Sequence, residues 1–235
     1  MTQAVRAEMA YKNVSLWLGR MGTIWRRSRI VGRMEHLVKF KSIAVVSALV
    51  SLASVARAWA PSANEQQILV SGQAFSEVLP SPDGAGQIQA AIDIAAPPKT
   101  VWTIMNDCHG MNRIVASMTS CKILSGDVRR GWDVREQITK GNFFVPTIHN
   151  VIRNDYQPYT LIRFHKAGGD LRIEEGEWRL EALDGGTGTR VIYINRVAAN
   201  IVAPAGLVRE GMKRDTAKVL INLRRVCLET VKARA

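Results

Sequence analysis

The segment 205–232 has the pattern of a long amphipathic helix, and it constrains the fold more than any other part of this sequence. Its apolar residues recur three and four positions apart, while lysines and arginines cover the other faces. The apolar positions are Leu207, Val208, Met212, Val219, Leu220, Leu223, Val226, Cys227 and Val231. Before this helix, period-two segments follow one another from 118 to 198. This order predicts a curved antiparallel sheet wrapped round a C-terminal helix, with an internal cavity for an apolar ligand.

The remaining elements follow from periodicity and turn residues. Strands are predicted at 87–94, 121–124, 132–138, 143–152, 159–165, 171–183 and 190–197. Two short helices are predicted after the first strand, one following Pro97 and one over 111–118. Turns are expected between them, for example at Asn154-Asp155 and Gln157-Pro158. The fold class is therefore α+β, with about seven strands.

The first 60 residues read as a leader with a secretory signal peptide. Lys39 and Lys41 precede an apolar run at 42–56, and small residues at 56–60 offer cleavage after Ala58 or Ala60. Met34 is an alternative start, and an uncleaved membrane anchor is the alternative interpretation. We expect export, to a bacterial periplasm or to the outside. Residues 61–85, which end in a Pro- and Gly-rich stretch, are predicted to be a linker before a ligand-binding domain at 86–235.

The charge distribution argues against nucleic acid as a partner. The net charge is +12, from 32 Lys/Arg and 20 Asp/Glu. Ten of the basic and two of the acidic residues lie in 1–60, so 22 and 18 remain for the rest of the chain. A net charge of +4 on that part is an ordinary solvated surface.

The three cysteines fit an oxidising compartment. Cys108 and Cys121 enclose a short loop and are predicted to form a disulfide, with two unpaired thiols as the alternative. Closing a loop of about 13 residues contributes about 3 kcal/mol in the loop-entropy description. Cys227 falls on the apolar side of the last helix and is predicted to be a buried small hydrophobe.

Catalytic and metal-binding motifs are absent from the sequence. There is no G-x-S-x-G, no H-E-x-x-H and no phosphate-binding glycine loop, and the histidines lack metal-ligand spacing. We therefore expect no metal and no cofactor. His149 and Arg163 are candidate polar groups of the cavity, and an exposed strand face is the alternative for both. Glu174, Glu175 and Glu177 could be paired carboxylates for acid–base work, but strand alternation splits them between the two faces, with Glu175 and Glu177 opposite Trp178 and Leu180. A solvated outer face is the favoured interpretation.

Three strings resemble a known superfamily. Residues 92–107 (IDIAAPPKTVWTIMND) resemble the first strand and helix of START-like domains of the polyketide cyclase/dehydrase and coenzyme-Q-binding type. Residues 176–180 (GEWRL) and 188–193 (GTRVIY) resemble the last two strands of that group. The resemblance covers 86–232 and implies a helix-grip fold with a hydrophobic cavity between sheet and helix. It does not imply catalysis.

The alternation of the strands gives the residues expected to line the cavity. They are Ile162, Phe164, Trp178, Leu180, Val191 and Tyr193 on the strands, and Met212, Thr216, Val219 and Leu223 on the helix. The chain is thus expected to bind a hydrophobic small molecule such as a lipid, isoprenoid or quinone. One alternative is a cyclase- or dehydrase-type enzyme using His149 or Tyr193 as general acid or base. Another is a membrane-surface or partner-binding module that makes transient membrane contact through the basic side of 205–232.

Overall fold

The computed structural model describes residues 59–81, 83–141, 146–199 and 204–234. The predicted signal peptide and the alternative start at Met34 lie outside these ranges, apart from the last two residues of the leader. Export therefore stays a prediction.

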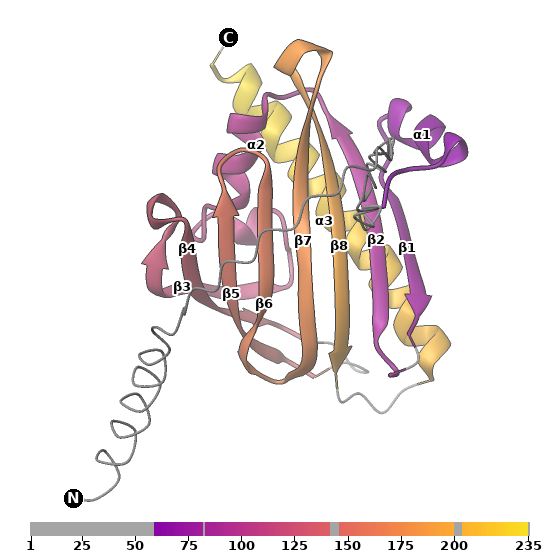
Figure 1. Ribbon diagram of the computed structural model, residues 1–235, viewed down its shortest axis with the longest axis vertical. Coiled ribbons are helices and arrows are strands. Elements are labelled where there is room, and N and C mark those ends of the chain that lie inside the picture. Colours follow the sequence, from indigo (N-terminus) through magenta and orange to yellow (C-terminus); the bar gives the residue numbers. More distant parts are fainter. Residues whose placement is uncertain (1–58, 82, 142–145, 200–203, 235) are drawn as a thin grey trace, which may run out of the picture. The chain divides into compact units, whose positions relative to one another are not determined.

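A single eight-stranded antiparallel sheet forms the body of the described domain (Figure 1). Its strands in chain order are β1 (Phe75–Pro80), β2 (Gly86–Ile94), β3 (Met118–Asp127), β4 (Trp132–Thr139), β5 (Ile148–Gln157), β6 (Leu161–Gly169), β7 (Leu171–Leu183) and β8 (Gly188–Ala199). Their order across the sheet is β1-β2-β8-β7-β6-β5-β4-β3. The strands β3 to β8 form a meander, and β8 then pairs with β2.

Three α-helices accompany the sheet: α1 (Ala63–Val70), α2 (Pro98–Met105) and α3 (Ala205–Lys232). Single 3-10 turns are η1 (Met111–Arg113), η2 (Val128–Arg130) and η3 (Asp184–Gly186). The helix α3 runs obliquely across one face of the sheet and contacts β1, β2 and α2 (Figure 1). The predictions of a helix over 205–232 and a strand over 171–183 are confirmed to the residue. Within the described ranges, none of the helices is long and apolar enough to cross a bilayer.

The prediction of a linker over 61–85 is wrong. Ser62 and Glu65 form a capping box that begins α1. After α1, β1 pairs with β2 from Phe75 opposite Ala91 to Pro80 opposite Gly86. The sheet therefore has one strand more than expected, because a short strand ending at a proline at the sheet edge carries a weak sequence signal.

The main core lies between the inner face of the sheet and the helices α2 and α3. Ile92, Val191, Leu220, Leu223 and Val226 are each at most 2% exposed. The buried residues of α3 all lie in its C-terminal half, from Leu220 to Cys227. The N-terminal half packs loosely, and the expectation that Leu207 lies on the packed side is wrong because its side chain is 70% exposed.

A second, smaller apolar cluster lies on the opposite, outer face of the sheet. Ala91 and Ile192 point away from α3, since their neighbours Ala90 and Val191 belong to the main core. Leu69 of α1 covers them. The paired strands β2 and β8 are therefore covered on both faces.

Two further predicted elements differ from the structure. The second predicted helix is only the single turn η1, after which Ile114 is buried. The turn predicted at Gln157 and Pro158 agrees with the structure, since β5 ends at Gln157 and Tyr159 has a φ of 63°, whereas Asn154 and Asp155, predicted as turn residues, lie inside β5. The reason is that Asn154 has a buried hydrogen-bonding partner, which makes an extended conformation favourable there.

The cysteine predictions agree with the structure. A disulfide joins Cys108, in the loop after α2, to Cys121 of β3, with Cα atoms 5.4 Å apart. Cys227 is free and fully buried on α3. Burial raises the pKa of its thiol to about 12, so it behaves as a small apolar side chain.

Candidate functional site on the inner face of the sheet

A row of large side chains crosses the centre of the inner face. Tyr193 of β8 lies opposite Trp178 of β7, which lies opposite Ile162 of β6, which in turn lies opposite Tyr156 of β5. The rings of Trp178 and Tyr193 are stacked with centroids 3.9 Å apart. Trp102 of α2 meets the ring of Tyr156 edge-on at 5.7 Å. These contacts make an aromatic floor that faces the helices.

The structure brings the predicted cavity residues to this interior. Those buried in it are Ile162, Phe164, Leu180, Val191 and Leu223. Those partly buried against the core are Trp178, Tyr193, Met212 and Val219. Thr216 is partly exposed on the N-terminal half of α3. Whether these residues touch a ligand stays a prediction.

Hollows that are open to solvent lie beside α3 and at one end of the sheet. One of about 350 Å³ lies along the C-terminal half of α3, between Ile221, Arg224 and Leu228. The other, of about 300 Å³, lies at the ends of β5 and β8 and is lined by residues including Ile148 and Ala199. Neither hollow is lined by the predicted cavity residues, but Ile148 and Ala199 pack against the main core, so the second hollow borders the interior.

The hypothesis that His149 and Arg163 are polar groups of the cavity is wrong. The side chain of His149 is 43% exposed, and its Nε2 lies 2.9 Å from Oε1 of Glu136. The side chain of Arg163 is 66% exposed and lies beside Glu177 of β7. Both belong to the outer face, because strand alternation points their neighbours Asn150 and Ile162, rather than them, into the core.

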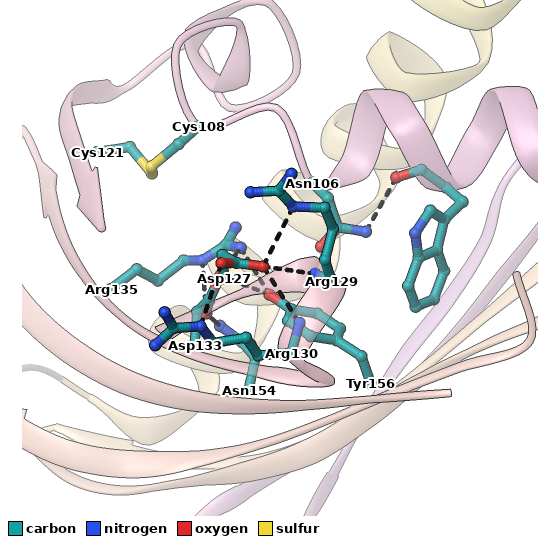
Figure 2. A network of polar contacts seen from close by, with 11 residues as sticks. Asn106, Cys108, Cys121, Asp127, Arg129, Arg130, Asp133, Arg135, Asn154 and Tyr156 are labelled. Atoms are coloured by element: carbon teal, nitrogen blue, oxygen red, sulfur yellow. Dashed lines mark hydrogen bonds and ion pairs between the residues drawn. A yellow bond between two sulfur atoms is a disulfide. The ribbon is translucent and has the colours of Figure 1, made fainter. Parts of the chain in front are cut away.

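The interior instead holds a buried ion pair on β4 (Figure 2). Arg135 Nη2 donates to Asp133 Oδ2 at 2.5 Å, and both side chains are at most 4% exposed. The Tyr156 hydroxyl donates to Asp133 Oδ2 at 2.8 Å, and Asn154 Nδ2 donates to Asp133 Oδ1 at 2.8 Å. The carboxylate thus has donors on both oxygens, as a buried charge requires.

Burial and charge act together on this cluster. Burial raises the pKa of the Tyr156 phenol, and the nearby Asp133 charge adds to the effect while Arg135 opposes it. Burial disfavours the charge of Arg135, but its hydrogen bond to Asp133 prevails and raises the pKa of the guanidinium. The cluster therefore combines the neutral phenol of Tyr156 with the charged pair of Asp133 and Arg135, and these side chains form most of their hydrogen bonds with one another.

A second polar cluster lies towards the other end of the inner face. Asn150 Nδ2 of β5 donates to the Glu174 carboxyl of β7, and Asn195 Nδ2 donates to the Tyr193 hydroxyl at 2.7 Å. Burial raises the pKa of Glu174, while the bond from Asn150 opposes the shift. Burial also raises the pKa of Tyr193, and the charge of Glu174 adds to it. Both shifts favour the neutral forms of these groups.

Sequence reasoning missed most of these polar residues because it assigned polar side chains to the outside. Glu174 lies on the same face as Trp178, as strand alternation predicted, so the favoured interpretation of a solvated outer face is wrong for this residue. The expectation holds for Glu175 and Glu177, which pair with arginines on the outer face. In the described residues, no group of three His, Cys, Asp or Glu side chains is arranged to hold a metal ion.

Comparisons with solved structures show the same fold. The aromatase/cyclase Zhui from Streptomyces sp. R1128 is 19% identical with a TM-score of 0.53, covering 63% of this chain and 97% of its own. A START superfamily protein from Mycobacterium smegmatis is 13% identical with a TM-score of 0.54, covering 63% and 99%. The lipid transfer and protein localization domain of human StarD13 is 11% identical with a TM-score of 0.53, covering 70% and 94%. At these identities the likeness concerns the fold alone.

The sequence itself matches a family. No curated protein matches the chain. Residues 94–224, more than half of the chain, match the family described as polyketide cyclase / dehydrase and lipid transport. Together with the helix-grip architecture, a sheet wrapped round a long C-terminal helix, this match implies binding of a hydrophobic ligand. The protein belongs to the polyketide cyclase/dehydrase and lipid-transport family.

Proposed function

We propose that the protein binds a hydrophobic small molecule, of the lipid, isoprenoid or quinone class, between the inner face of the sheet and α3. The observation that carries the proposal is the aromatic floor. Trp178 and Tyr193 lie on central strands, flanked by fully buried residues, yet both keep part of their surface accessible. Accessible aromatic surface at the centre of a concave face is what an apolar ligand would cover.

Apolar burial supplies the driving force. Covering about 200 Å² of apolar surface contributes about 5 kcal/mol before the costs of association, at about 25 cal/mol per Å². The loosely packed half of α3, residues 205–219, supports access from that side, because few buried contacts need to break for it to move. A cofactor has no part in this function.

Native mass spectrometry of the full chain, produced in an oxidising compartment, tests the proposal. Organic extraction then identifies whatever co-purifies. A stoichiometric apolar compound supports ligand binding and names its class. A protein that arrives empty and does not bind a panel of lipids, isoprenoids and quinones contradicts it.

We further propose that this protein works outside the cytoplasm. The disulfide between Cys108 and Cys121 supports this proposal, since such bonds persist in oxidising compartments. N-terminal sequencing of secreted material tests it. Cleavage after Ala58 or Ala60 is the expected result, and an intact, cytoplasmic N-terminus would overturn it.

An enzyme of cyclase or dehydrase type is the second candidate, and one observation favours it. Tyr193 offers a buried phenol whose raised pKa keeps it protonated and able to donate to a substrate carbonyl. His149 no longer qualifies, because it lies on the outer face. Loss of turnover in Tyr193→Phe with ligand binding intact would establish the enzyme; no turnover of any polyketide-like substrate by the wild type argues against it.

Transient membrane contact through α3 stays a prediction. Leu207 and Ile221 are exposed apolar residues on a helix rich in lysine and arginine. Co-sedimentation with anionic liposomes that disappears at high salt would support such contact, and an absence of co-sedimentation at low salt would contradict it.

A further inference from the structure

Two buried amides on the inner face leave half of their hydrogen-bonding capacity unused. Asn150 is 6% exposed and Asn195 is 3% exposed. Each uses its Nδ2 within the protein, but neither Oδ1 has a partner. An unpaired buried polar atom costs about 1–3 kcal/mol, and native proteins keep few of them. These two oxygens therefore require an explanation.

The two amides belong to one region of the interior. Asn195 lies opposite Gly176 on β7, two residues from Glu174 along the same face. Glu174 in turn accepts from Asn150, which reaches it from β5. Asn150, Glu174, Asn195 and Tyr193 thus form one cluster, which we call the amide cluster.

The amide cluster lies beside the aromatic floor and close to an opening. Tyr193 belongs to both, because its ring stacks on Trp178 while its hydroxyl accepts from Asn195. Ile148 and Ala199 line the hollow of about 300 Å³. Ile148 lies two positions before Asn150 on the inner face of β5, and Ala199 lies two positions after Val197, which itself follows Asn195 by two on β8. An apolar body over the floor would bring its polar end to the amides.

The chemistry of the cluster selects the kind of polar end. The free end of a side-chain amide complements a hydroxyl whichever way the amide is turned, because a hydroxyl both donates and accepts. An ionised carboxylate or phosphate is disfavoured, because it has no hydrogen to donate to these oxygens and because Arg135, the cation at the other end of the inner face, is already paired with Asp133. An ether or a ketone can only accept, so it leaves two acceptor oxygens unpaired.

We propose that the amide cluster binds the hydroxyl of a neutral, apolar alcohol, through Asn150 or Asn195. The inference rests on the proposed function and narrows it, because it separates alcohols from acids, ethers and quinones. In this arrangement the hydroxyl donates its one hydrogen to the Oδ1 of Asn150 or of Asn195, and the aromatic floor contacts the hydrocarbon part of the ligand.

Displacement of the neutral dye N-phenyl-1-naphthylamine from the full-length protein tests the inference. Three competitors share one hydrocarbon body: farnesol, farnesyl methyl ether and farnesoic acid. We expect farnesol to compete about tenfold more strongly than either analogue, because only the alcohol can donate a hydrogen bond to one of these oxygens. This ranking is measured on the wild type, so it does not depend on a variant that folds.

Matched variants then locate the effect. Asn150→Leu and Asn195→Leu each remove one of the two candidate acceptors. In the variant that lacks the accepting oxygen, the preference for farnesol should fall to about twofold or less, while the ether binds at least as well as before. His149→Leu is the control, since it lies next to Asn150 on the same strand but faces outward, and it should keep the full preference.

The outcomes separate this inference from the proposed function. If the dye binds and all three competitors displace it equally, or if both leucine variants keep the preference, the inference is wrong and apolar binding stands. A preference for the acid also overturns it. If neither the dye nor any competitor binds, the proposed function fails, and the inference fails with it.

Discussion

Replacing Arg135 by methionine should destabilise the protein severely. The substitution removes the guanidinium and leaves the carboxylate of Asp133, which is 0% exposed, without a counter-charge. Breaking a buried pair in this way costs about 3–5 kcal/mol. The hydrogen bonds from Tyr156 and Asn154 remain, and they keep the cost within this range rather than above it.

Urea unfolding followed by far-UV circular dichroism measures this cost. With a slope of about 2 kcal/mol per M, the midpoint should fall by about 1.5–2.5 M. The matched control is Arg153→Met, which breaks the pair with Asp155 on the outer face, where the side chains are 34% and 49% exposed. An exposed pair contributes at most about 1 kcal/mol, and the contact of Arg153 with the Trp132 ring adds about as much.

The double variant Asp133→Asn, Arg135→Met completes the test. Because the second substitution removes the charge that the first leaves unpaired, the double variant should lose less stability than the sum of the single variants. If Arg135→Met costs no more than Arg153→Met, the assignment of a buried, charged pair is refuted.

Three further predictions concern the inner face and the disulfide. Burial raises the pKa of Glu174 in the folded protein, so its contribution to stability is present below its unfolded pKa and is lost as pH rises through the folded value. Glu174→Gln should therefore raise the urea midpoint more at pH 8 than at pH 4. Gly176→Ala should cost about 1–3 kcal/mol, measured by thermal unfolding, because the new methyl would collide with the backbone carbonyl of Ile194. Replacing Cys108 and Cys121 together by alanine should cost about 3 kcal/mol, also by thermal unfolding.

Each of these three predictions can be contradicted by a specific measurement. A constant difference between Glu174→Gln and wild type across pH would show that Glu174 is not perturbed by burial. Gly206→Ala controls for Gly176, since no atom lies within 4 Å of its added methyl, and it should stabilise α3 by about 0.5–1 kcal/mol. Equal effects of the two glycine substitutions would contradict the crowding at Gly176. A cysteine-free variant as stable as the wild type would show that the loop needs no bridge.

The regular elements could be predicted because their patterns are long. The helix 205–232 and the strand 171–183 carry several turns or repeats of one period. The elements of segment 61–85 could not be predicted, because its one short helix has little amphipathic character and β1 ends in Pro80. Their stability comes from packing on β2 and β8, which a local pattern does not contain.

The site was predictable only in its apolar half. Strand alternation through Trp178 predicted which apolar side chains face the helices, and the same alternation places Glu174 on that face. The buried pair of Asp133 and Arg135 could not be predicted, because charged residues normally face water and the further hydrogen bonds to Asp133 come from β5. Such partners become visible only once the register of β4 and β5 is known.

The double covering of β2 and β8 has a consequence for how the domain opens. Their amides are held between neighbouring strands on both sides and lie beneath apolar clusters on both faces, so their hydrogens exchange with solvent only when the whole domain unfolds. The first half of α3 lacks such cover, and its amides exchange through small local openings. If the proposed ligand enters beside α3, we therefore expect it to do so through local opening of the first half of this helix, while the paired strands β2 and β8 stay closed.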